Sequence, residues 1–202
     1  MNGFRQEYGV NFDEIFSPVV KMTTLHFMLH VVAAENLELI QLDVKTTFLH
    51  GDLKEEIYME QPKGFVASGQ EHLVCRLRKS LYGLKQAPRQ WYKKFDDFIQ
   101  SVGFSKSDED HCLFTKTAQD RSPVFLIIYV DDMLLSGRHA GELTELVRKL
   151  WLKFAMKDLG LARHILGMKI CRHRDKRQLF LSQTDYIGRV LERFNMQSAK
   201  SA

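Results

Sequence analysis

The apolar run from Phe125 to Leu135 is interrupted by two adjacent aspartates, Asp131 and Asp132. Its β-branched and aromatic residues are typical of a buried strand. Burying two carboxylates costs free energy unless hydrogen bonds, a cation or a raised pKa compensates for it. The pattern therefore predicts a strand-turn-strand hairpin with the Asp pair at its tip, facing a divalent metal. For an isolated pair the alternative is a plain tight turn, in which Asp is common.

The composition is that of one globular domain, or of one domain with a smaller lobe. The chain has 202 residues, of which 45% are hydrophobic, and a formal net charge of +4, which permits nucleic-acid binding without requiring it. Cys75, Cys112 and Cys171 have no CxxC spacing, which indicates reduced thiols rather than a disulfide framework or a zinc site. No apolar run is long enough to span a bilayer, so no membrane partner is expected.

The periodicity of apolar residues predicts helices and strands that do not alternate strictly. Helices are expected over 23–36, 88–102 and 143–154 and around 187–194, and strands over 37–44, 57–59, 74–77, 112–116, 124–130, 133–136, 165–170 and 178–181. This mixture predicts an α+β fold in which an antiparallel sheet is covered by helices on one face.

A third carboxylate, Asp43, is expected at the end of the strand over 37–44. If that strand neighbours the Asp-pair hairpin, all three carboxylates project to one edge of the sheet. Such a cluster suits Mg²⁺, a hard ion that prefers oxygen ligands. Two ions held there would activate an attacking hydroxyl and neutralise a leaving pyrophosphate. Because neighbouring strand residues point to opposite faces, Asp131 and Asp132 cannot be equivalent ligands.

Several motifs resemble the reverse transcriptase of copia-type LTR retrotransposons. They are DVKTTFLHGDL at 43–53, SLYGLKQAPRQW at 80–91 and YVDD at 129–132, with further matches at 16–20, 58–62, 156–160 and 181–183. The matches follow the family's order over essentially the whole chain. The resemblance implies that 1–202 is a reverse transcriptase (RNA-dependent DNA polymerase) domain, the palm and partial fingers of a right-hand polymerase, without the RNase H and integrase regions of the polyprotein.

The resemblance also implies a role for each matched residue. Asp43, Asp131 and Asp132 would be catalytic and would hold two Mg²⁺ ions, or Mn²⁺ as a substitute, with the Val44 carbonyl completing the metal shell. By analogy Asp131 is the stronger ligand and Asp132 the peripheral one. The residues implied to contact the incoming dNTP are Val44, Lys45, Thr46, Thr47, Phe48, Lys85 and Gln86.

Four of the implied roles have plain alternatives. Lys85 would lie beside the incoming nucleotide, or it is an ordinary exposed lysine. Phe48 would be the aromatic gate that excludes a ribose 2′-hydroxyl, or it is a core residue. Lys157 would be the general acid that protonates pyrophosphate, or it is an ordinary surface lysine. Leu166 and Gly167 would form the primer grip, or a simple hairpin turn.

The sequence departs from the family pattern in two places. The family's basic segment of the type KARLVAKGF, expected to hold the triphosphate, is nearly all missing ahead of Gly3-Phe4, so the fingers are expected to be shortened. Thr47 stands where the family usually has Ala, and its extra atoms crowd the expected nucleotide site.

The expected function is RNA- and DNA-templated DNA synthesis from dNTPs on a template-primer. The family implies an intracellular location, in cytoplasmic virus-like particles, with the nucleus as an alternative. One rival is an inactive remnant that at most binds nucleic acid through basic residues: Arg76, Arg78, Lys79, Lys85 and Arg89. A metal-dependent nuclease or phosphatase is disfavoured because the sequence offers no dedicated water-activating base.

Overall fold

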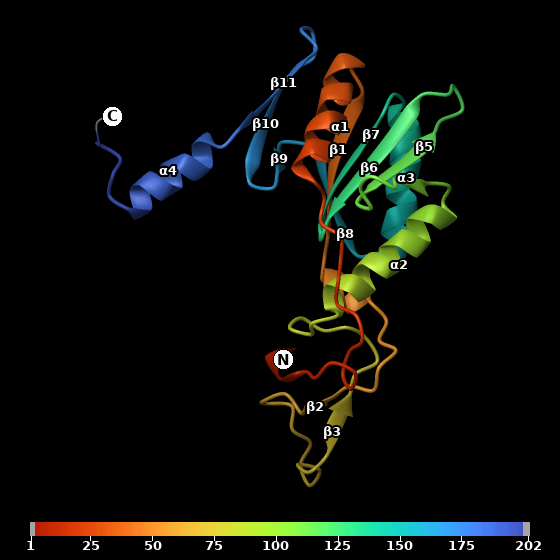
Figure 1. Ribbon diagram of the computed structural model, residues 1–202, viewed down its shortest axis with the longest axis vertical. Coiled ribbons are helices and arrows are strands. Elements are labelled where there is room, and N and C mark those ends of the chain that lie inside the picture. The colour runs from red at the N-terminus through yellow and green to blue at the C-terminus, as the bar shows by residue number, and fades with distance from the viewer. Residues whose placement is uncertain (1–2, 200–202) are drawn as a thin grey trace.

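A six-stranded antiparallel sheet forms the centre of the computed structural model, which describes residues 3–199 (Figure 1). Its strand order is β4-β5-β6-β7-β1-β8. These strands are β1 (Glu38–Val44), β4 (Ser105–Lys106), β5 (Leu113–Thr117), β6 (Pro123–Tyr129), β7 (Asp132–Gly137) and β8 (Met156–Leu161). A three-stranded sheet contains β9 (His164–Ile165), β10 (Met168–His173) and β11 (Gln178–Ser182), and β2 (Tyr58–Glu60) pairs with β3 (Val74–Arg76).

Within the described part of the chain, four α-helices lie close to the predicted positions. They are α1 (Met22–Ala34), α2 (Ala87–Ser101), α3 (Ala140–Lys153) and α4 (Thr184–Arg193), and two short 3₁₀ helices, η1 (Gly3–Arg5) and η2 (Thr47–His50), complete the fold. Pro88 lies in the first turn of α2, where its missing N–H has no cost. Gly103 follows the end of α2 with φ +94°, a conformation that glycine adopts without strain. The mixed α+β fold with antiparallel sheets is thus confirmed.

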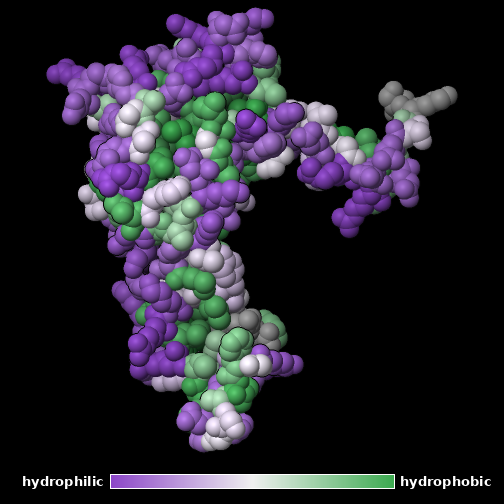
Figure 2. Space-filling view, turned by 180° about the vertical axis from the view of Figure 1, so that it is seen from behind, coloured by the Kyte–Doolittle hydropathy of each residue, from purple (hydrophilic) through white to green (hydrophobic). Residues whose placement is uncertain are grey.

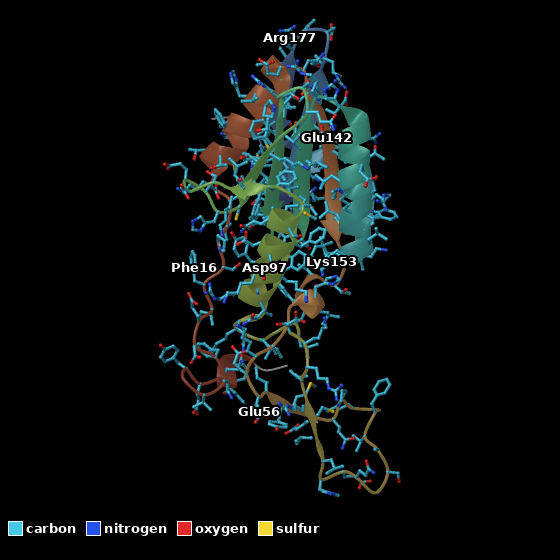
Figure 3. All side chains as sticks on the ribbon, turned by 90° about the vertical axis from the view of Figure 1, so that its right-hand side faces the viewer. Phe16, Glu56, Asp97, Glu142, Lys153 and Arg177 are labelled. Carbon is cyan, nitrogen blue, oxygen red and sulfur yellow. The ribbon has the colours of Figure 1, made fainter. Side chains whose placement is uncertain are left out.

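The central sheet is covered on both faces, and the prediction of helices on one face only is wrong. On one face the ring of Phe95 in α2 lies 5.7 Å from that of Phe114 in β5. Figure 3 shows α1 on the opposite side of the sheet from α3. Every residue from Met133 to Gly137 is buried. Because successive strand residues point to opposite faces, such a run needs cover on both.

A smaller lobe and an arm extend from this body. The lobe contains residues 3–16 and 51–86, and its buried cluster joins Ile57 and Leu84 to Ala87, the first residue of α2 (Figure 1). It exposes Phe65 and Val74, and Figure 2 shows hydrophobic residues on its surface. The arm is α4, which has no buried residue and points away from the sheet (Figure 1). Within residues 3–199, no helix has the length and apolar character needed to cross a membrane.

In the last third of the chain the predicted strand over 178–181 is confirmed as β11, whereas two other strand predictions were incomplete. The predicted strand over 165–170 is divided into β9 and β10 by a two-residue turn, in which Leu166 and Gly167 have φ values of +50° and +75°. Strand β8 was not predicted, because only Met156 of its residues is buried and no apolar alternation marks it. It nevertheless forms an edge of the central sheet beside β1.

We expect Leu126→Ala to destabilise the protein strongly. Leu126 is 0% exposed in the middle of β6, so the truncation leaves a cavity and lowers the free energy of unfolding by about 2–5 kcal/mol. Leu152→Ala is the matched control, because Leu152 is 76% exposed on α3, and it should cost less than about 0.5 kcal/mol. Urea unfolding of both variants measures the difference, and equal losses would contradict this account of the core.

Candidate active site

The three aspartates lie where three neighbouring strands of the central sheet end. Strands β1 and β7 pair with Asp43 directly opposite Asp132. Tyr129 and Asp132 close the β6–β7 hairpin, so Val130 and Asp131 form its two-residue loop. The predicted hairpin and the predicted adjacency of the Asp43 strand are both confirmed. Asp43 and Asp132 are half-buried, whereas Asp131 is exposed in the loop.

Negative charge is concentrated around Asp132. Burial raises the pKa of the Asp132 carboxyl above its ordinary value, and the neighbouring Asp131 carboxylate raises it further. A hydrogen bond with Gln41 opposes this rise, and the charge of Asp43 adds to it. The carboxyl is therefore costly to ionise as the site stands, and a bound cation would remove that cost.

The backbone of Val44 is bonded on both sides. Its N–H donates to the Asp131 carbonyl over 2.9 Å, which ties the end of β1 to the hairpin loop. Its carbonyl accepts a hydrogen bond of 2.8 Å from the hydroxyl of Thr47, which is 2% exposed. A carbonyl oxygen has two lone pairs, so one remains for a further partner.

The residues after Val44 form a tight corner that leads into η2. Lys45 and Thr46 are exposed, and Thr46 has φ +50°. Phe48 is half-buried, packs against both the main core and the cluster of the smaller lobe, and lies 4.8 Å from the ring of Tyr82. The ring therefore lies at the junction of the two parts of the molecule.

Lys85 and Gln86 are held by the N-terminal segment. The Lys85 ammonium donates to the Gln6 carbonyl over 3.1 Å and lies 4.9 Å from the centre of the Phe12 ring. Gln86 is 0% exposed: its amide accepts from Gln6 and donates to the carbonyl of Asn11, both over 2.9 Å. Sequence reasoning missed Gln6 and Asn11, because isolated amides carry no spacing signal.

The two remaining predicted sites lie apart from each other. Lys157 on β8 is exposed and pairs directly opposite Asp43 on β1. Leu166 and Gly167 form the turn between β9 and β10, which belong to the separate three-stranded sheet.

The donor set at the strand ends is chemically suited to a hard cation. Its side-chain donors are carboxylate oxygens, which Mg²⁺ prefers. A bound cation would also offset the burial and the carboxylate repulsion that raise the pKa of Asp132. Among residues 3–199, no three His, Cys, Asp or Glu side chains are gathered closely enough to hold an ion as they stand. The carboxylates must therefore converge for an ion to bind.

Comparison with known proteins identifies similar sequences along the whole chain. The family model described as "Reverse transcriptase (RNA-dependent DNA polymerase)" matches residues 1–202. The chain is 56% identical over 200 residues to the "Retrovirus-related Pol polyprotein from transposon TNT 1-94" of Nicotiana tabacum, covering 99% of this chain and 15% of that protein.

More distant relatives carry similar descriptions. The "Retrovirus-related Pol polyprotein from transposon RE1" of Arabidopsis thaliana is 38% identical over 98% of this chain and 13% of its own length. The "Transposon Ty1-DR4 Gag-Pol polyprotein" of Saccharomyces cerevisiae is 31% identical over 70% of this chain and 9% of its own length. The chain thus spans a small part of these relatives. No solved structure matches it significantly.

We expect Asp132→Asn to stabilise the cation-free protein at neutral pH. The folded-state pKa of Asp132 is raised, so its favourable contribution is complete below the unfolded pKa and is lost as the pH rises through the folded value. Asn cannot ionise, so the variant escapes this loss, and its advantage should vanish as the pH falls to about 4. Thermal melts in EDTA across this range measure the effect.

Asp97→Asn provides the control for that experiment, because Asp97 is exposed on α2. It removes a carboxylate without reducing the repulsion among the three aspartates of the site, and it should leave the melting temperature nearly unchanged. A pH-independent difference between Asp132→Asn and the wild type would contradict the assignment.

Proposed function

Because this chain belongs to the reverse transcriptase (RNA-dependent DNA polymerase) family, we propose that it carries the polymerase centre of a copia-type Pol polyprotein. Asp43, Asp131 and Asp132 would act in transferring dNTPs to a primer 3′ end on an RNA or DNA template. The observation that carries this proposal is the pairing of Asp43 with Asp132 beside the loop that contains Asp131. The central sheet with α2 and α3 would be the palm, and the smaller lobe the partial fingers.

The surrounding residues have matching roles in this proposal. The carboxylates and the free lone pair of the Val44 carbonyl would hold two Mg²⁺ ions, with Mn²⁺ as a substitute. When bound, such ions lower the pKa of the primer hydroxyl and neutralise the leaving pyrophosphate. Lys157, opposite Asp43, lies on the strand from which it would donate a proton to pyrophosphate.

The nucleotide itself would be bound between the corner after β1 and the loop before α2. Lys45, Thr46 and Phe48 belong to that corner, and Lys85 with Gln86 to that loop. Phe48, at the junction of the lobes, would exclude a ribose 2′-hydroxyl. Leu166 and Gly167 would contact the primer. The template-primer and the RNase H and integrase regions of the same polyprotein are the proposed partners.

An inactive nucleic-acid binder is the second candidate, and the contacts of its basic residues weigh against it. Arg76 pairs with Glu56 over 2.7 Å, and Lys79 with Asp52 over 3.3 Å. Arg89 pairs with Glu14. Three of the five basic side chains thus have carboxylate partners already, which reduces what each would gain from a phosphate.

We expect the chain to extend a DNA primer on an RNA template in the presence of Mg²⁺. Asp131→Asn should lower the rate by at least about 100-fold, the scale of losing one electrostatic group at a reacting centre. Asp97→Asn, the same change on the exposed face of α2, should keep the wild-type rate. Gel-based primer extension measures all three proteins.

Binding measurements separate the two candidates. Fluorescence anisotropy of a labelled template-primer, titrated in EDTA and in Mg²⁺, reports binding without chemistry. Salt-dependent binding together with wild-type extension no faster than that of Asp131→Asn would refute the polymerase and support the inactive binder.

A further inference from the structure

The loop that carries Asp131 has an unfavourable residue at its first position. Val130 has φ +56°, in the left-handed region that β-branched residues avoid. In a two-residue hairpin loop with a positive φ at the first central residue, glycine is the usual occupant. A strained residue persists only where its surroundings hold it in place, and such residues gather at functional sites.

A buried tryptophan of helix α2 contacts this residue. The indole N–H of Trp91, in α2, donates to the carbonyl of Val130 over 2.6 Å. Trp91 is 1% exposed, and its ring is fixed by neighbouring rings, 5.7 Å from Phe95 and 5.1 Å from Phe154. An indole has only this one donor, so no other hydrogen bond from the side chain competes with it.

A second bond completes the anchoring of the loop. The next carbonyl, that of Asp131, accepts from the N–H of Val44 in β1. The two consecutive carbonyls of the loop are therefore fixed by different elements, α2 and β1. The Val44 bond involves only backbone, whereas the Trp91 bond depends on one side chain.

We propose that Trp91 is a positioning residue that holds Val130 in its left-handed conformation and thereby fixes the direction of Asp131. The role of Asp131 in polymerisation rests on the proposed function, but the restraint on the loop does not. A tryptophan that only filled the core would be replaced by phenylalanine without effect on the loop. The indole N–H is thus the group to test.

The first test observes the loop directly and requires no activity. In protein labelled with ¹⁵N-aspartate, the amide resonance of Asp131, identified by its loss in Asp131→Asn, should shift or broaden in Trp91→Phe. Adding Val130→Gly to that variant should restore a single sharp resonance, because glycine adopts positive φ without help. Trp151→Phe is the matched control, since Trp151 is 53% exposed on α3.

The chain contains two tryptophans, which simplifies a second readout. The indole N–H of Trp91 should exchange with D₂O much more slowly than that of Trp151. An unchanged Asp131 amide in Trp91→Phe, a perturbation that Val130→Gly does not reverse, or equal indole exchange would overturn the proposal.

Kinetics then connect the restraint to the reaction. Trp91→Phe should lower kcat for primer extension by about 10- to 100-fold, the scale of a small misplacement of a reacting group, with KM for dNTP unchanged. Val130→Gly should recover most of that loss. A loop perturbed as expected in a wild-type protein without polymerase activity would refute the proposed function and leave the positioning role of Trp91 in place.

Discussion

The antiparallel register between β1 and β7 is the constraint on which the rest of the structure depends. It sets Asp43 opposite Asp132 and brings the end of β1 against the β6–β7 loop. A slip of one residue would move every side chain of β1 to the other face, exchanging Leu42 in the core for Asp43. The burial of both faces of β7 therefore fixes the position of the carboxylates as firmly as it fixes the core.

The same burial explains which parts of the fold were predictable. The run from Phe125 to Leu135 contains so many apolar residues that a single continuous strand would bury its two aspartates. A hairpin avoids this cost by placing them at the turn. The same run does not predict that the second face of the central sheet is also covered. An apolar side chain does not specify whether a helix or another strand packs against it. Strand β8 has one buried residue, so only its pairing with β1 makes it a strand.

Some residues of the candidate site were likewise predictable from the sequence, and others were not. Asp43, Asp131 and Asp132 were found from sequence because carboxylates at the ends of apolar strands are chemically conspicuous. Gln86 was matched to the nucleotide site, yet its amide is fully buried and bonded to Gln6 and Asn11. The apolar periodicity of its helix predicts only that Trp91 is a core aromatic residue. Its hydrogen bond to the loop was not predictable, because the acceptor is a backbone carbonyl 39 positions away in the sequence.

Helix α2 connects these observations. It begins at Ala87, which packs into the smaller lobe directly after Gln86, the partner of Gln6. About one turn later it presents Trp91 to the loop beside the aspartates. A helix is stiff over so short a distance, because its backbone hydrogen bonds fix each residue relative to the next turn. The hydrogen bond from Gln6 to Gln86 and the one from Trp91 to Val130 therefore lie at the same end of this helix. The smaller lobe and the loop that carries Asp131 therefore both contact the first turns of α2.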